Sequence, residues 1–246
     1  MRPILVTTPR SGSTIILRLL GSLATQHFSC KGILHEPFTI TELFKSDYKK
    51  INNIITIVNH ERLGYKWFDS KREEKLKVIS LLKDDYDYVF KLFPIDMEIE
   101  IEDMIKCYYA PILLERKDKI EQLLSWVRLF TTNVAHFLKT DAQQVTELRY
   151  DAFHANEFIR HLSAYRAYND SCTNYKLIFY EDFLQQGADE SALIHLLGLP
   201  IIKYTQLDIL TKPTPYCTSL EDIITNKDEW LRDKPMLIRR ISDLGF

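Results

Sequence analysis

A short loop rich in hydroxyl side chains follows the first apolar run of the sequence. It extends from Thr8 to Thr14 and reads Thr-Pro-Arg-Ser-Gly-Ser-Thr. Gly12 allows the backbone to turn tightly and to approach a ligand closely. The main-chain amides from Ser11 to Thr14 can then point at a tetrahedral anion, beside the positive end of the helix that follows. Together with the charge of Arg10, these groups predict a site for a phosphate or a sulfate.

This loop differs from the Walker A loop of nucleoside triphosphatases. The Walker pattern reads Gly-x-x-x-x-Gly-Lys-(Ser/Thr), whereas the loop here is shorter and its cation, Arg10, precedes Gly12. A simpler interpretation is a tight strand-to-helix turn in which a Ser or Thr caps the helix. The residues of the loop alone leave both interpretations open.

Short apolar runs alternate with segments of helical periodicity along the chain. The runs that predict strands are Ile4–Thr8, Tyr88–Phe93, Ala110–Leu114 and Tyr175–Tyr180. The alternation predicts one α/β domain over residues 1–246, in which helices flank a central parallel β-sheet. Ligands of such sheets bind beyond the carboxyl ends of the strands, so the loops after these four runs are where a site is expected.

The composition is that of an ordinary globular protein, with 46% hydrophobic and 27% charged residues. A net charge of −2 without a basic run argues against nucleic acid as a partner, so any anion site must be local. No apolar stretch has membrane-spanning length, and the first strand-like run begins too early for a signal peptide. The four cysteines are scattered without a Cys-x-x-Cys pair, which indicates reduced thiols and a cytoplasmic protein.

The string from Pro9 to Thr14 resembles the 5′-phosphosulfate-binding loop of sulfotransferases that use 3′-phosphoadenosine 5′-phosphosulfate (PAPS). With two later matches, the resemblance covers roughly residues 3 to 200. It implies a P-loop NTPase-like three-layer sandwich, closer to bacterial and carbohydrate-type members than to the animal cytosolic subgroup. The residues that it implies for the sulfated end of the donor are Arg10, Ser11, Gly12, Ser13 and Thr14.

The second match lies where a predicted strand leads into a helix. Arg116 ends the strand, and Ser125 follows about two helical turns later. The resemblance implies that this pair binds the 3′-phosphate of the nucleotide, and a guanidinium offers two parallel donors to a phosphate. Lys117 has the spacing of the animal cytosolic enzymes, so it shares or replaces the role of Arg116. The alternative is a solvated charge cluster at the start of a helix.

The third match is Tyr-Glu-Asp at 180–182, followed by Leu-Gly-Leu-Pro at 197–200. In relatives the tyrosine of this segment lies near the adenine. Tyr180 is therefore implied to stack on the base or to donate a hydrogen bond to it. The alternative for Tyr180 is an aromatic ring that packs in the core at the end of a strand.

A lysine is the implied catalytic cation. Lys91 ends the strand that precedes the Arg116 strand, where relatives carry a lysine that reaches the transferring group. Lys66 is a rival, although the strand order favours Lys91. Leu92 and Phe93 replace the Thr and His that follow this lysine in the cytosolic subgroup, so the histidine base of that subgroup is absent.

The base that accepts the acceptor proton is implied to be Glu36. Carbohydrate-type and bacterial members carry an acidic residue soon after the first helix, and Glu36 is followed by proline as in many of them. A carboxylate that titrates near its usual value is ionised and able to take a proton. His35 is the reserve candidate, and His60 remains open.

The sequence thus predicts a sulfotransferase that moves the sulfuryl group of PAPS to a hydroxyl acceptor, for example on a carbohydrate, and releases 3′,5′-adenosine bisphosphate without a metal. Arg10 and Lys91 stabilise the charge that develops. Lys212 is a reserve candidate for a cation that binds the nucleotide. The stretch from Thr39 to Lys75 is expected to shape the side of the site that binds the acceptor. The alternatives are a kinase-like P-loop enzyme and an inactive domain that binds the bisphosphate.

Overall fold

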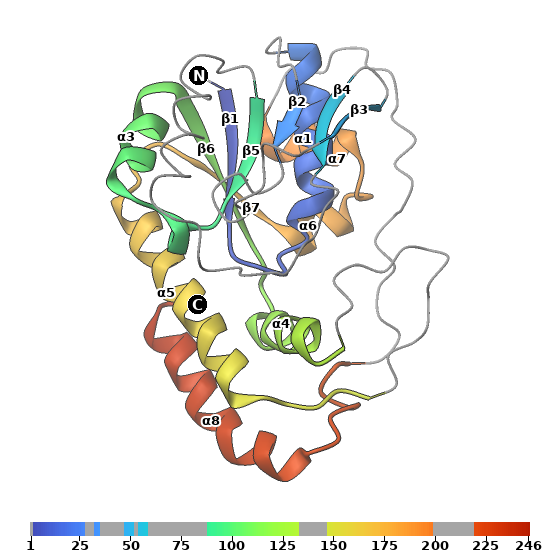
Figure 1. Ribbon diagram of the computed structural model, residues 1–246, viewed down its shortest axis with the longest axis vertical. Coiled ribbons are helices and arrows are strands. Elements are labelled where there is room, and N and C mark those ends of the chain that lie inside the picture. The colour runs from blue at the N-terminus through green and yellow to red at the C-terminus, as the bar shows by residue number, and fades with distance from the viewer. Residues whose placement is uncertain are drawn as a thin grey trace.

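Strand β1 (Arg2–Thr7) lies inside the sheet, parallel to both of its neighbours, β5 (Tyr88–Leu92) and β6 (Tyr109–Glu115). The computed structural model describes residues 2–27, 32–34, 47–51, 54–58, 88–132, 147–198 and 219–246. These residues form a seven-stranded sheet in the order β3-β4-β2-β5-β1-β6-β7. The remaining strands are β2 (Gly32–Leu34), β3 (Asp47–Ile51), β4 (Ile54–Val58) and β7 (Lys176–Phe179). Of the seven, β3 at one edge runs antiparallel to its neighbour (Figure 1).

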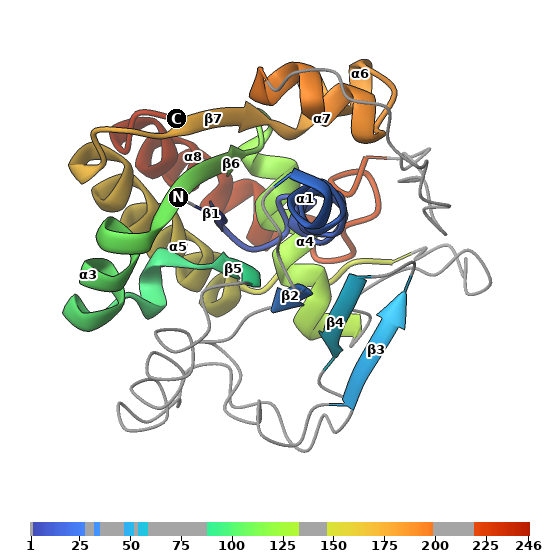
Figure 2. The ribbon, with the colours of Figure 1, turned by 90° about the horizontal axis from the view of Figure 1, so that it is seen from above.

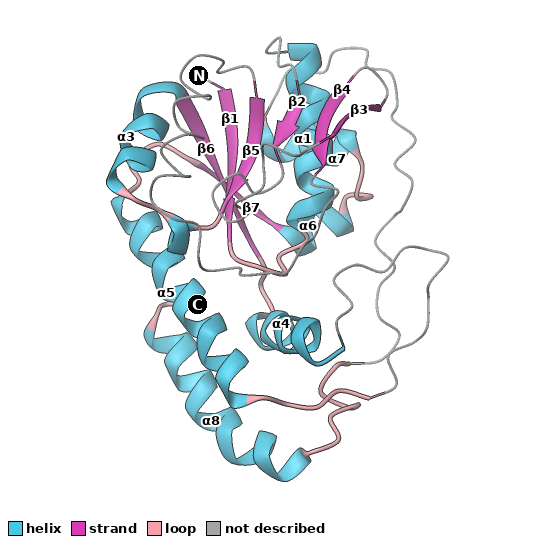
Figure 3. Ribbon diagram, in the orientation of Figure 1, coloured by secondary structure: helices cyan, strands magenta, loops and turns pink. Residues whose placement is uncertain are grey.

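Helices lie on both faces of the sheet and beyond its carboxyl edge (Figure 3). They are α1 (Ser13–His27), α3 (Ile99–Tyr108), α4 (Lys119–Thr132), α5 (Ala152–Ser171), α6 (Tyr180–Gln185), α7 (Glu190–Leu197) and α8 (Lys227–Asp243), with a 3-10 turn, η2 (Pro94–Asp96). None of the described helices combines the length and the apolar character needed to cross a membrane. The predicted α/β fold, a central parallel sheet flanked by helices, is confirmed.

Side chains of β1 alternate between two hydrophobic layers, because successive residues of a strand point to opposite faces. Leu5 belongs to the core that joins the sheet to α1 and α7. Ile4 and Val6 belong to the core on the other face, with α3 and Tyr165 of α5. Figure 2 shows α1 on one side of the sheet and α3 and α5 on the other. A strand covered on both faces carries a continuous apolar run, as β1 does from Ile4 to Val6.

A further helical layer lies beyond the carboxyl ends of β1 and β6 (Figure 1). Here α4, α5 and α8 share a third core, which contains Trp126, Phe158 and Trp230. Asp151 caps the start of α5, since its carboxylate accepts hydrogen bonds from the amides of Phe153 and His154. This layer places the first turns of α4 directly after the end of β6, next to the loop that follows β1.

His161 of α5 is buried where this helical layer meets the end of β5. Its ring packs edge-on against Phe93, which follows β5, and against Trp126 of α4. Burial, with a smaller contribution from the Arg160 guanidinium, lowers the pKa of His161 from 6.5 to about 4. The native protein therefore holds this imidazole neutral at pH values where an exposed histidine is charged.

This neutral histidine predicts a loss of stability in acid. The unfolded chain takes up a proton near pH 6.5, whereas native His161 does so only near pH 4, so acid favours the unfolded state between these values. We expect the free energy of unfolding to fall by about 3 kcal/mol from pH 6.5 to pH 4 on this account, and to be independent of His161 above about pH 7.5. Urea denaturation of the wild type and of His161→Leu over this range measures the difference, and parallel pH profiles of the two proteins would contradict it.

Candidate functional site

The loop after β1 is tied to strand β6 by buried hydroxyl groups. Thr7 Oγ1 donates to the main-chain oxygen of Leu114 at 2.9 Å and is hydrogen-bonded to Ser11 Oγ at 2.6 Å. Thr7 and Ser11 are fully buried. The hydroxyl of Ser11 therefore serves the loop itself, and what Ser11 offers to a ligand is its main-chain amide.

The loop leads directly into α1, which begins at Ser13. The first amides of a helix have no acceptor within the helix. Among the described residues, the amide of Ile15 bonds to the main-chain oxygen of Gly12 at 3.3 Å, whereas the structure gives Ser13 and Thr14 no such acceptor. These two amides and the helix dipole are among the groups that the sequence predicts to bind an anion.

Arg10 holds an unusual backbone conformation for a residue other than glycine. Its φ is +61° and that of Gly12 is +78°. A residue with a Cβ in this left-handed region is strained by about 1–3 kcal/mol, and such strain persists where surrounding contacts fix it. The guanidinium of Arg10 meets α4, since its Nε donates to Ser125 Oγ at 3.1 Å. The structure thus brings together Arg10 and Ser125, which the resemblance assigns to opposite ends of one nucleotide.

Gln122 of α4 is a residue that the sequence interpretation missed. It is fully buried, and its Nε2 donates to Thr8 Oγ1 at 2.8 Å and to the main-chain oxygen of Pro9 at 2.7 Å. Gln122 stands one helical turn before Ser125, so both residues lie on the same face of α4. The three-residue spacing of Gln122 and Ser125 could have identified Gln122 from the sequence, because two polar residues on one buried helix face need hydrogen-bond partners.

The ring of Tyr180 covers Gly12. A Cβ added to Gly12 would lie 2.1 Å from Cε2 and 2.4 Å from Cδ2 of Tyr180, so only a glycine allows the ring to approach this closely. The guanidinium of Arg116 lies 5.8 Å from the centroid of the same ring. The first strand-to-helix loop, the end of β6 and the end of β7 therefore meet at Tyr180.

Arg116 and Lys117 differ in where they point. Arg116 Nε lies 3.6 Å from Glu181 Oε1, with 17% of the arginine side chain exposed. Lys117 is paired with Asp182, and 51% of its side chain is exposed. Its ammonium lies over the ring of Phe179 rather than over Tyr180. Of the two cations that the sequence left open for the 3′-phosphate, Arg116 is therefore the one beside Tyr180.

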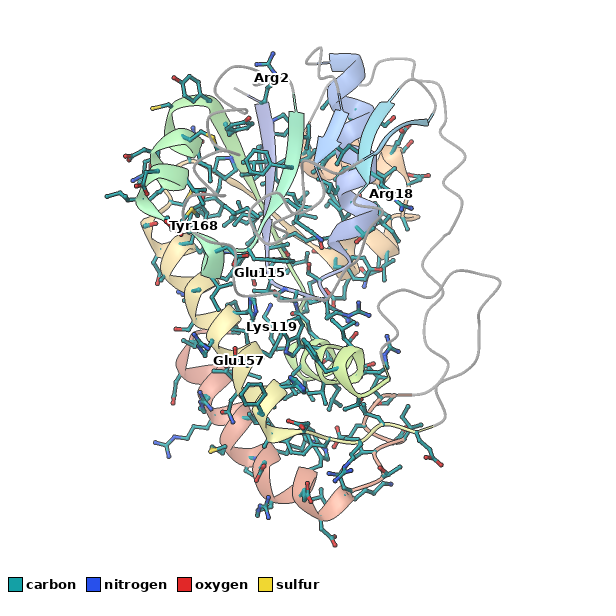
Figure 4. The ribbon with its side chains drawn as sticks, in the orientation of Figure 1. Arg2, Arg18, Glu115, Lys119, Glu157 and Tyr168 are labelled. Carbon is teal, nitrogen blue, oxygen red and sulfur yellow. The ribbon has the colours of Figure 1, made fainter. Side chains whose placement is uncertain are left out.

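A buried ion pair flanks Arg116 in the chain and joins the last residue of β6 to the first residue of α4. Lys119 Nζ is 3.4 Å from Glu115 Oε2 and donates to the main-chain oxygen of Arg116. Figure 4 shows Glu115 and Lys119 at this junction. Burial lowers the pKa of Lys119, and the carboxylate of Glu115 opposes this effect. The pair holds the backbone of Arg116, which fixes the point from which its guanidinium extends.

Lys91, the predicted catalytic cation, lies near the carboxyl end of β5, on the strand next to β1. It is buried and pairs in register with Leu5 of β1. Its ammonium lies 5.2 Å from the centroid of the Phe93 ring. Lys91 therefore lies at the same edge of the sheet as the loop that contains Arg10.

Several predicted residues lie outside the part of the chain that the structure describes. These are the proposed base and its reserves, the rival lysine and the reserve cation for the nucleotide: Glu36, His35, His60, Lys66 and Lys212. Within the described ranges, no group of three or more His, Cys, Asp or Glu side chains has an arrangement that could hold a metal ion.

No protein-family model matches this chain, and no curated protein is similar to it.

The contact between Gly12 and Tyr180 predicts a specific double-mutant result. Gly12→Ala combines left-handed strain, worth about 1–2 kcal/mol, with a collision of its Cβ and the Tyr180 ring. We expect it to lower the free energy of unfolding by more than the strain alone. In a Tyr180→Ala background the collision is absent, so the loss should return to about 1–2 kcal/mol. Urea denaturation of the four proteins measures this, and equal losses in both backgrounds would refute the close contact.

Proposed function

We propose that this protein is a PAPS-dependent sulfotransferase, which transfers the sulfuryl group of PAPS to a hydroxyl acceptor. The proposal depends on one observation. Arg10 of the loop after β1 bonds to Ser125 of α4, and Tyr180 contacts both Gly12 of that loop and Arg116, which directly follows β6. A loop suited to the sulfated end of the donor and an arginine suited to its 3′-phosphate thus flank one tyrosine that can stack on the adenine.

The reaction needs cations and amides but no bound metal. The acceptor oxygen attacks sulfur in line while the bond between sulfur and the 5′-phosphate oxygen breaks, and the acceptor proton passes to a base. Negative charge then develops on the leaving phosphate of 3′,5′-adenosine bisphosphate, as it does in phosphoryl transfer. Arg10, Lys91 and the amides of the loop are the groups proposed to stabilise this charge. Glu36 is the proposed base.

Binding of the 3′-phosphate is proposed to replace the contact between Arg116 and Glu181. Ion pairs that water reaches contribute about 0–1 kcal/mol, and Arg116 and Glu181 keep 17% and 26% of their side chains exposed. Hydrogen bonds from a guanidinium to a phosphate are stronger, about 1.5–3 kcal/mol. The exchange is therefore favourable for a doubly charged phosphate, although Arg116 and Lys117 are each paired with a carboxylate in the ligand-free site.

The cytoplasmic location is part of the same proposal. It is supported by the scattered cysteines and by Cys107 and Cys172, which are free thiols among the described residues. The acceptor is proposed to be a small molecule or a glycan that carries a hydroxyl group.

The proposal predicts which nucleotide binds and why. Adenosine 3′,5′-bisphosphate should raise the melting temperature without magnesium, whereas stabilisation by ATP with magnesium would favour the kinase-like alternative. Arg116→Met should weaken binding of the bisphosphate by about 10- to 100-fold, because it removes charge-assisted bonds to the 3′-phosphate. Its affinity for AMP, which lacks that phosphate, should remain that of the wild type. Calorimetric titration measures both affinities.

Lys117→Met is the matched control for Arg116→Met, since it removes the neighbouring cation that points to Phe179. It should leave the preference for the bisphosphate over AMP nearly unchanged. If Lys117→Met abolished that preference and Arg116→Met did not, the assignment of the 3′-phosphate to Arg116 would be wrong.

The proposed base makes a separate prediction about turnover. Glu36→Gln keeps the shape of the side chain but cannot accept the acceptor proton, so we expect transfer from PAPS to fall by about 10²- to 10⁴-fold with nucleotide affinity unchanged. His35→Gln is the matched control and should retain activity. The assay follows release of labelled sulfate ester from a panel of sugar and phenol acceptors. Full activity of Glu36→Gln would exclude Glu36 as the base, and turnover lost only in His35→Gln would transfer that role to His35.

A further inference from the structure

Gln122 donates both of its side-chain amide hydrogens to the loop after β1. Its Nε2 lies 2.7 Å from the main-chain oxygen of Pro9 and 2.8 Å from Thr8 Oγ1. Pro9 O can only accept a hydrogen bond, so this contact fixes which end of the Gln122 amide faces the loop. The residue is fully buried, where a lost partner is not replaced by water.

The contact with Pro9 also orients the next residue. The oxygen of Pro9 and the amide hydrogen of Arg10 belong to one planar trans peptide and point in opposite directions. By holding that oxygen toward α4, Gln122 sets the plane of the peptide that enters Arg10. The left-handed backbone of Arg10, with φ +61°, begins at this plane.

The side chain of Arg10 is held by the same helix. Ser125 follows Gln122 by three residues, and its hydroxyl accepts the hydrogen bond from Arg10 Nε at 3.1 Å. Two adjacent positions on one face of α4 therefore hold the entry peptide and the guanidinium of one strained arginine. Such strain persists only where several contacts fix the residue.

We propose that Gln122 is a positioning residue that keeps the loop from Pro9 to Thr14 in its anion-binding conformation through the main-chain oxygen of Pro9. The inference extends the proposed function, since it rests on that loop holding the 5′ end of the nucleotide. Gln122 acts through Arg10 and the loop amides and does not itself contact the ligand. It therefore acts on every ligand that has a 5′-phosphate, whether or not a 3′-phosphate is present.

The test compares Gln122→Met, which keeps the length of the side chain but cannot donate, with Thr8→Val. The threonine variant removes one acceptor of Gln122 and leaves the bond to Pro9 intact. Gln122→Asn, which is one methylene too short to reach Pro9, is a second variant that remains polar. The first measurement is hydrogen exchange in the ligand-free protein, which needs no nucleotide.

We expect Gln122→Met and Gln122→Asn to raise exchange of the hydrogen-bonded amides among residues 10–15, such as that of Ile15, by about tenfold, the factor that corresponds to one buried hydrogen bond. Exchange in α5 and in β6 should be unchanged, and Thr8→Val, which leaves one hydrogen of Gln122 unpaired but keeps the bond to Pro9, should raise exchange in the loop by less than either Gln122 variant. Unchanged exchange in the loop would overturn the proposal. Equally raised exchange in the loop, α5 and β6 would overturn it as well, because it would mean that Gln122 only packs α4 against the rest of the fold.

The second measurement is the affinity for AMP and for adenosine 3′,5′-bisphosphate. Gln122→Met should weaken both by the same factor, about tenfold, so the ratio of the two affinities stays that of the wild type. A loss confined to the bisphosphate would overturn the proposal, because Gln122 would then act on the Arg116 end. If the wild type bound neither nucleotide while exchange rose in the loop alone, Gln122 would still position the loop, and the proposed function would be what fails.

Discussion

The parallel pairing of β1 with β5 and β6 is the constraint on which the rest of the structure depends. Parallel strands end at the same edge of a sheet, so residues that follow different strands are brought within reach of one another. Leu5 pairs with Lys91 on one side and with Ile112 on the other. This register places the loop after β1 next to the end of β6, where the Thr7 hydroxyl can bond to Leu114. A shift by one residue would turn these side chains to the opposite face.

The helical layer beyond this edge gives the loop a rigid partner. Helix α4 starts four residues after β6 ends, and its position is fixed by the core that it shares with α5 and α8. The ion pair of Glu115 and Lys119 is buried at this junction, so it contributes geometry more than stability, since the cost of desolvating two charges offsets much of their attraction. What the layer provides to the site is a fixed helix face, on which Gln122 and Ser125 reach the loop.

The cations that follow β6 are paired with nearby carboxylates, and the whole chain has a net charge of −2. Arg116 and Lys117 each lie beside a carboxylate of the segment that follows β7, Glu181 and Asp182. These pairs join the end of β6 to the start of α6 in the absence of a ligand. In the proposed function the 3′-phosphate replaces the carboxylate of Glu181, because the guanidinium can donate two parallel hydrogen bonds to two phosphate oxygens.

The sequence by itself determined the class of the fold and the position of the loop. Continuous apolar runs such as Ile4 to Val6 identify strands that are covered on both faces, and the flanking periodicity identifies the helices. Gly12 and the hydroxyls around it identify a turn that leads into a helix. A tight turn and a helix cap each depend on a few neighbouring residues, so the local sequence is enough to predict them. The role of Glu36 remains a prediction, because this residue lies outside the described part of the chain. The nature of the acceptor remains a prediction as well.

Only the tertiary structure decided what faces that loop. The Ser11 hydroxyl bonds to Thr7, Tyr180 covers Gly12, and Gln122 holds Pro9. The bonds from α4 to the loop join residues that are 113 to 115 positions apart in the chain. No periodicity of the sequence encodes such a distance, because it results from the register of the strands and from the packing of α4. The sequence therefore identifies the polar and charged groups of the loop, and the packing of distant segments decides which other residues they contact.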